Sequence, residues 1–134
     1  EIRETKNELV LFDGPRIERA ATKVMRWLAP RGKVFVVGET PYIGTARAFF
    51  PTYEARLKAG DPWPGVVENA VTYDPKRASL LPKLFHLLDE RTLRRVFTAA
   101  GFEIEQLEMF ARPDYPTDIQ LDGRESVGLI AVKK

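Results

Sequence analysis

The segment Pro15–Tyr42, PRIERAATKVMRWLAPRGKVFVVGETPY, decides the fold because it predicts a helix, a tight turn and a strand in succession. In its first half, apolar residues recur at the spacing of an amphipathic helix, which begins after Gly14 and ends before Pro30. The apolar stripe consists of Ile17, Ala20, Ala21, Val24, Met25 and Leu28. We therefore predict a helix over residues 15–28.

The second half of this segment contains Val34–Val37, an apolar run without alternation. Such a strand is typical of a parallel sheet with helices on both faces. A parallel partner strand is expected before the helix, and Leu9–Phe12 is the only apolar candidate, whereas the polar residues 1–8 are expected to be frayed. Residues 38–42 follow the strand at its carboxyl end, where open α/β sheets bind their ligands.

The last third of the chain predicts a second helix and two further strands. Asp89 is placed to cap a helix over residues 90–100. Residues 102–110 are expected to form a strand with a register change at 106–107, and residues 126–132 a final strand. Because the connection between these strands is not helical, we expect them to be antiparallel.

Residues 41–82 separate these two parts and form an irregular, aromatic region that holds six of the ten prolines. A helix is expected within residues 46–58 and a short strand within residues 66–73. Long irregular segments in compact domains are usually functional covers or disordered, and the aromatic content here argues against disorder. We therefore expect a cover over a ligand site.

Composition and charge restrict the classes of function. The chain has 134 residues, enough for one domain, and its net charge of +2 is too small to indicate nucleic-acid binding. It has no cysteine, which excludes disulfides and thiolate metal sites, and no metal-ligand cluster is evident. We expect a cytoplasmic protein, because no apolar run approaches the ~20 residues of a membrane span and no signal peptide is visible.

The order of these elements resembles the carboxyl-terminal half of a class I, Rossmann-like S-adenosylmethionine-dependent methyltransferase. Leu28–Val36 is similar to the family's turn into its fifth strand, and Leu9–Phe12 stands where the fourth strand ends. The run Leu88–Phe102, which ends in Ala-Ala-Gly-Phe, is similar to the helix before the sixth strand. Gly128–Lys133 is similar to the seventh strand.

The resemblance implies an α/β fold, namely half of a doubly wound sheet with an antiparallel final strand pair. Residues 1–134 would form one partial domain, with residues 41–82 as an inserted cover on the acceptor side. The implied function is transfer of a methyl group from S-adenosylmethionine to a small-molecule acceptor. The alternative is a non-catalytic binding or interaction domain that retains the same sheet.

The sequence departs from the family where the cofactor is held. It lacks the glycine-rich turn and the acidic residue that bind S-adenosylmethionine, and Arg31 replaces a glycine of the turn before the fifth strand. We therefore expect a fragment that by itself binds the cofactor weakly or not at all. Leu11 and Phe12, at the end of the implied fourth strand, are the residues expected to contact it.

Candidate acceptor-binding residues lie at the end of the central strand and in the cover. Glu39 and Tyr42 follow the strand, and they are either ligand contacts or a solvated carboxylate and a packing tyrosine. Tyr53, Trp63 and Tyr73 either line an apolar acceptor pocket or simply pack the cover onto the domain.

His86 is the only histidine and the only candidate catalytic residue. It stands between Phe85 and Leu87, so it is either a base directed into the acceptor site or a hydrogen-bonded packing residue. We expect Glu39, Tyr42 and His86 to meet at one cavity beneath the cover.

We also expect the chain to associate with another polypeptide. A doubly wound sheet cut before its fifth strand leaves Val34–Val37 with an unpaired apolar edge, which is a template for another strand. The helix at 15–28 is expected to cover one face of the sheet and the helix at 90–100 the other. The partner is either a second copy or the missing amino-terminal half, in contact with Leu9–Phe12 or Val34–Val37.

Overall fold

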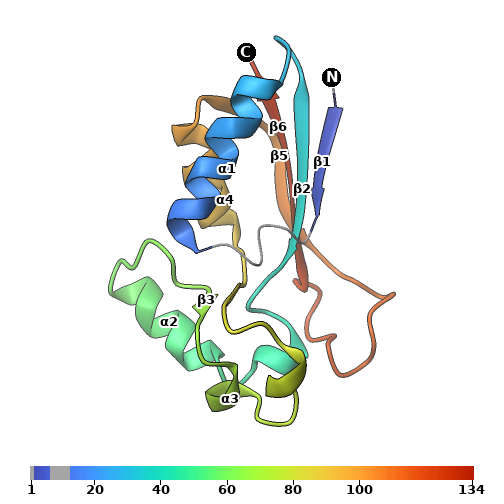
Figure 1. Cartoon of the computed structure of the whole chain (residues 1–134). Coiled ribbons are helices and arrows are strands. Elements are labelled where there is room, and N and C mark those ends of the chain that lie inside the picture. The colour runs from blue at the N-terminus through green and yellow to red at the C-terminus, as the bar shows by residue number, and fades with distance from the viewer. Residues whose placement is uncertain (1, 7–12) are drawn as a thin grey trace.

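The computed structural model of the chain describes residues 2–6 and 13–134, and it is built on a four-stranded sheet in the order β1-β2-β6-β5 (Figure 1). The strands are β1 (Ile2–Lys6), β2 (Lys33–Glu39), β5 (Phe102–Phe110) and β6 (Ser126–Lys133). β1 is parallel to β2, whereas β6 is antiparallel to both β2 and β5. The predicted antiparallel final pair is therefore confirmed, and a register shift between Ile104 and Gln106 lies next to its predicted position.

Two long helices, α1 (Gly14–Trp27) and α4 (Glu90–Ala99), confirm the two predicted amphipathic helices. Each begins at an aspartate whose carboxylate accepts a backbone N–H of the first turn, Asp13 from Arg16 and Asp89 from Thr92. Such caps satisfy backbone donors that have no partner inside the helix. In Figure 1 both helices lie on the same side of the sheet, so the prediction that they cover opposite faces is wrong.

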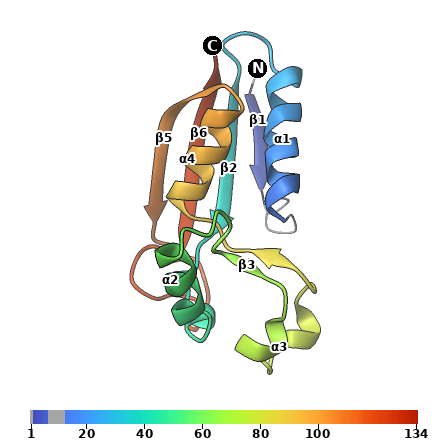
Figure 2. The ribbon, with the colours of Figure 1, turned by 90° about the vertical axis from the view of Figure 1, so that its left-hand side faces the viewer.

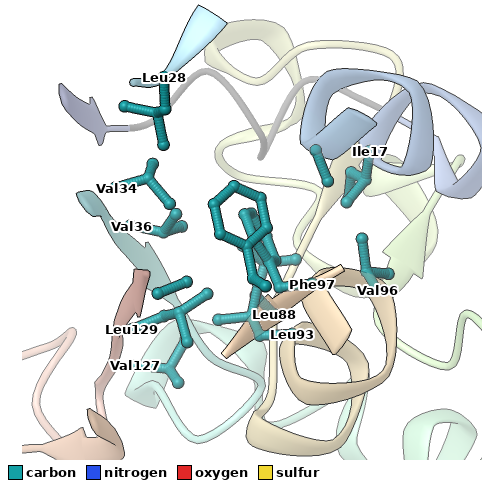
Figure 3. Close-up of a cluster of buried hydrophobic side chains, with 13 residues drawn as sticks. Ile17, Leu28, Val34, Val36, Leu88, Leu93, Val96, Phe97, Val127 and Leu129 are labelled. Atoms are coloured by element: carbon teal, nitrogen blue, oxygen red, sulfur yellow. The ribbon is translucent and has the colours of Figure 1, made fainter. Parts of the chain in front are cut away.

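The main core fills the space between these helices and the sheet (Figure 3). Its largest buried side chains come from α1, β2, α4 and β6, and they include Ile17, Val34, Val36, Leu93, Phe97 and Leu129. Val34 and Val36 point into this core, whereas Phe35 and Val37 point to the opposite face and are partly exposed. The prediction that Val34–Val37 is buried on both faces is therefore wrong, because helices cover only one face.

β2 occupies a central position in the sheet rather than an edge. It pairs with β1 on one side and with β6 on the other, so the predicted unpaired edge at Val34–Val37 does not exist. Its parallel partner is Ile2–Lys6, a segment that we expected to be frayed. An edge strand is held by backbone hydrogen bonds and tolerates charged residues, which is why its polar sequence was misleading. The expected partner, Leu9–Phe12, lies outside the described residues.

Residues 41–82 lie beyond the carboxyl end of β2, at the lower end of the sheet in Figures 1 and 2. The elements here are the 3₁₀ helix η2 (Gly44–Ala46), α2 (Phe50–Lys58), β3 (Val66–Val67), α3 (Ala70–Tyr73) and the 3₁₀ helix η3 (Ala78–Leu80), and β3 pairs with β4 (Phe85–His86). The strand predicted within residues 66–73 is therefore a two-residue strand followed by a short helix. We call residues 41–82 the cover.

The cover has a hydrophobic cluster of its own, separate from the main core. Its buried members are Ile43, Ala46, Phe49, Tyr53 and Val67 of the cover, together with Leu87, which follows β4. This cluster explains how an irregular, proline-rich segment keeps a defined structure. Among the residues that the structure describes, no helix is both long and apolar enough to cross a membrane.

Candidate functional site

A cavity of about 300 Å³ lies between the cover and the carboxyl end of β2. Glu39, the last residue of β2, forms part of its wall, and Ile119 of the β5–β6 connection forms another part. The remaining wall comes from the cover and from residues 85–87 and is largely apolar. Its apolar members include Ile43, Phe49, Val67, Phe85 and Leu87. A concave, apolar site with a few polar groups is the usual form of a small-molecule pocket.

Among the described residues, three charged side chains stand on the cavity wall, namely Glu39, Asp74 and Arg77. The guanidinium of Arg77 is already engaged, because it forms an ion pair with Asp118. Within the described residues, the carboxylates of Glu39 and Asp74 form no hydrogen bond or ion pair, although Glu39 acts electrostatically on Arg112. The Arg112 guanidinium is itself held by Asp114 through two hydrogen bonds.

Of the predicted acceptor-binding residues, Glu39 and Tyr73 line this cavity. The Tyr73 ring also packs edge-on against Phe49, with 5.1 Å between the ring centroids. Tyr42, Tyr53 and Trp63 do not line it. The structure thus divides the predicted set into cavity residues and residues that hold the cover in place.

Tyr53 connects the cover to the main core. Its hydroxyl donates a 2.6 Å hydrogen bond to the Asp89 carboxylate, and both residues are buried. Burial, followed by the hydrogen bond and the charge of Asp89, raises the pKa of Tyr53 well above its usual range. A neutral, hydrogen-bonded tyrosine in this position favours the packing alternative.

Tyr42 is held from two sides outside the cavity. Its ring packs edge-on against Phe50 at 5.3 Å and Tyr53 at 6.0 Å. The guanidinium of Arg124 lies 3.7 Å from the ring centroid and is paired with Asp122. Tyr42 therefore joins the cover to the connection between β5 and β6.

His86 is fully buried, and it points away from the cavity. Phe85 and Leu87, its neighbours along the chain, both line the cavity. Because successive side chains of an extended segment point in opposite directions, His86 faces the other side. Its ring lies edge-on to the Trp63 indole at 5.9 Å. The expected meeting of Glu39, Tyr42 and His86 at one cavity is therefore wrong.

Trp63, a residue of the cover, packs against the start of α1. Its indole lies so close to Gly14 that a Cβ added there would be 1.9 Å from the ring. The guanidinium of Arg95 stacks over the same ring at 4.3 Å and donates a hydrogen bond to the carbonyl of Pro62. These contacts hold the loop before β3 against both long helices.

The β5–β6 connection, which supplies Ile119 to the cavity, is organised by Glu125. This residue is only 2% exposed, and its carboxylate accepts backbone N–H groups from Arg112, Leu121, Asp122 and Gly123. Burial opposes ionisation, but these hydrogen bonds outweigh it and lower the pKa of Glu125 to about 2. The carbonyl of Ile119 accepts the N–H of Gly44, which joins this connection to the cover.

Sequence reasoning missed Asp74, Arg77 and Ile119 on the cavity wall. No pattern in the sequence points to Asp74 and Arg77 as a pair with Glu39, because they are brought together only when the cover folds back on the sheet. The proline after Asp74 and the aromatic residues around it were the only local signal of a bend at this place.

The predicted cofactor contacts, Leu11 and Phe12, lie outside the described residues. The parallel pairing of Lys6 with Val37 brings the carboxyl ends of β1 and β2 to the same edge of the sheet, beside Glu39. In the part of the chain that the structure describes, no group of three acidic or histidine side chains is arranged to hold a metal ion.

Solved structures align with nearly the whole of this chain. An S-adenosylmethionine (SAM)-dependent methyltransferase from Methanosarcina mazei aligns with a TM-score of 0.65 at 16% identity, over 98% of this chain and 58% of that chain. A SAM-dependent methyltransferase from Mesorhizobium loti aligns with a TM-score of 0.62 at 16% identity, over 98% of this chain and 61% of that chain. The chain has a class I SAM-dependent methyltransferase-like fold.

The methyltransferase-like fold also aligns with magnesium protoporphyrin IX methyltransferase from Synechocystis, solved with bound SAH, with a TM-score of 0.53 at 15% identity, over 99% of this chain and 44% of that chain. The chain thus spans less than two thirds of the length of each of these methyltransferases. No protein-family model matches the chain, and a search of curated protein sequences gave no match.

Proposed function

We propose that this chain is the acceptor-binding part of a SAM-dependent methyltransferase that acts on a small molecule. The observation that supports this most strongly is the cavity at the carboxyl end of β2, enclosed by the cover, in a methyltransferase-like fold. Ligands of open α/β sheets bind at this edge. The chain would contribute by positioning the acceptor, which is a large part of catalysis in a transfer between two bound molecules.

SAM is the proposed methyl donor, but the residues present do not form a complete site for it. The nine glycines are dispersed along the chain, and no two of them are fewer than five residues apart. We propose that a further polypeptide segment supplies the cofactor contacts, in line with the 58% and 61% of the aligned methyltransferases that this chain covers. The lack of cysteine is compatible with a reducing, cytoplasmic location for the assembled enzyme.

The open face of the sheet is the proposed docking surface for that segment. Phe35 and Ile130 are cross-strand neighbours on this face, and the Phe110 ring packs over Gly128 beside them. A groove of about 260 Å³ follows these residues. In Figure 1 no helix of the described residues lies on this side of the sheet. An apolar sheet face of this kind favours a protein partner. We therefore propose that the cofactor-binding part of the enzyme covers it.

The experiment measures methyl transfer from isotopically labelled SAM to a panel of small acceptors by the complete gene product that contains this chain. We expect labelled product, and we expect Ala70→Leu to suppress it without loss of SAM binding, because Ala70 lines the cavity and a larger side chain fills it. The matched control is Ala55→Leu, on the exposed side of α2.

Two results would contradict the proposal. The first is a complete gene product that does not bind SAM, which would favour the alternative of a non-catalytic binding domain. The second is equal methyl transfer by the Ala70→Leu and Ala55→Leu variants, which would separate the cavity from the reaction.

A further inference from the structure

The described cavity wall carries more carboxylates than cationic side chains, and this difference affects which ligands the cavity can bind. Two carboxylates, those of Glu39 and Asp74, line it, and within the described residues neither forms an ion pair. Arg77, the one cationic side chain that the described residues place on the wall, forms an ion pair with Asp118. An otherwise apolar wall therefore offers two carboxylates with which no described side chain forms an ion pair.

We infer that the cavity selects an apolar molecule that carries a protonated amine. This inference rests on the proposed function, because it takes the cavity to be the acceptor site. The amine would pair with the carboxylate of Glu39 or Asp74, and the apolar body would contact Phe49, Phe85 and Ile43. The amine is a recognition group, and it is held in this way whether or not its nitrogen is the methylated atom.

The size of the cavity limits the apolar body. A volume of about 300 Å³ is at the lower end of the range for ligand pockets, which favours a body of a ring or two over a long chain or a macrocycle. The rings of Phe49, Tyr73 and Phe85 supply flat apolar surface, and aromatic faces also attract cations. The aromatic side chains would thus contact the apolar body of the ligand, and the carboxylates would bind its amine.

The same wall disfavours an acidic ligand. A carboxylate in the cavity would meet the charges of Glu39 and Asp74, and it would have to compete with Asp118 for Arg77. A neutral alcohol avoids this repulsion but gains no charge-assisted hydrogen bond, and such bonds are roughly twice as strong as neutral ones. The expected order of affinity is therefore amine, alcohol, carboxylate.

The test measures binding of three matched probes to the 134-residue chain by NMR titration or calorimetry at neutral pH, in the absence of SAM. The probes are phenethylamine, phenethyl alcohol and phenylacetate, which share an aromatic body and differ in the charge of the terminal group. We expect the amine to bind about tenfold or more tightly than the alcohol, and the carboxylate to bind most weakly.

Variants locate the preference at the cavity. Glu39→Gln and Asp74→Asn are each expected to reduce the ratio of amine to alcohol affinity, whereas Glu54→Gln removes the same charge from the exposed side of α2 and should leave the ratio unchanged. The inference is overturned if the alcohol or the carboxylate binds as tightly as the amine. It is also overturned if the ratio of amine to alcohol affinity is unchanged in both Glu39→Gln and Asp74→Asn, or if phenethylamine does not bind.

Failure of this inference is distinguishable from failure of the proposed function. Amine binding by the chain, combined with no methyl transfer by the complete gene product, would contradict only the proposed function. Methyl transfer to alcohols or acids, combined with no preference for the amine probe, would contradict only the inference.

Discussion

The hydroxyl of Tyr53 donates a 2.6 Å hydrogen bond to Oδ2 of Asp89, while Oδ1 of the same carboxylate accepts the N–H of Thr92 and caps α4. One buried carboxylate thus joins the cover to the helix that packs on the sheet. Tyr53 and Asp89 are distant in sequence, so this hydrogen bond fixes α2 of the cover against α4 of the main core. Both partners of this contact are buried side chains.

We predict that Tyr53→Phe destabilises the protein. The substitution leaves Asp89 with one fewer donor in a buried site, and a hydrogen bond to a charged group contributes about 1.5–3 kcal/mol. Equilibrium unfolding in urea measures the free energy of unfolding. The control is Tyr73→Phe, because the Tyr73 hydroxyl meets Thr52 only at 3.5 Å and should contribute little. An equal decrease in the free energy of unfolding in the two variants would show that loss of the Asp89 hydrogen bond does not cause the destabilisation.

Glu125 gives the protein an acid-sensitive stability. Its pKa in the folded state is about 2, below the ordinary value of 4.5, because its carboxylate accepts several backbone N–H groups. A folded-state pKa below the unfolded-state value stabilises the protein above the unfolded pKa, and this contribution is lost as the pH falls toward the folded pKa. We therefore expect the Glu125 contribution to decline between about pH 4.5 and pH 2.

The Glu125→Gln variant tests this directly. At neutral pH we expect it to lose about 1–3 kcal/mol of stability, because a neutral amide cannot replace the acceptor geometry of the carboxylate. Unfolding curves measured at several pH values should show that the difference from the unmodified protein shrinks below about pH 4.5. Glu103→Gln on the exposed surface of β5 is the matched control. A difference that is independent of pH would contradict the assignment.

The contact between Gly14 and Trp63 predicts a steric effect at the start of α1. Gly14→Ala places a Cβ within 1.9 Å of the indole, so the ring must move, and overpacking of this kind costs about 1–3 kcal/mol. Tryptophan fluorescence should shift toward the red as Trp63 becomes more exposed. In a Trp63→Leu background the same substitution should cost much less, which a double-mutant cycle measures. Additive changes in the free energy of unfolding would show that residues 14 and 63 are not in contact.

The absence of cysteine makes the proposed docking face easy to probe. Phe35→Cys introduces a single thiol on the open face of the sheet, and Thr98→Cys places one on the exposed surface of α4. We expect the thiol at residue 35 to react with a labelling reagent in the 134-residue chain and to be protected when the cofactor-binding part is present. The thiol at residue 98 should react equally in both.

Two labelling results would contradict the proposed partner. Protection of the thiol at residue 35 that increases with the concentration of this chain alone would identify a second copy as the occupant. Equal reactivity with and without the cofactor-binding part would show that this face stays open.

Local patterns in the sequence determined the two long helices, the Asp89 cap of α4 and the final pair of strands. The apolar stripe of Ile17, Ala21 and Leu28 depends only on residues within a few turns, and so does the Asp89 cap. β5 and β6 are also consecutive in the chain, with no helix in the described residues between them, so their antiparallel pairing could be predicted from the local sequence. These elements were sufficient to indicate the fold class, because their order along the chain is itself distinctive.

Tertiary structure alone decided which strand pairs with β2, which face the helices cover and which side chains reach the cavity. The polar segment Ile2–Lys6 pairs through its backbone, which leaves no hydrophobic signal in the sequence. Whether His86 or its neighbours face the cavity depends on the pleat of a two-residue strand, where a shift of one residue reverses every side chain. Glu39, Asp74 and Ile119 meet only because three separate segments converge, and contacts over such separations are encoded by the packing of the whole chain rather than by any local pattern.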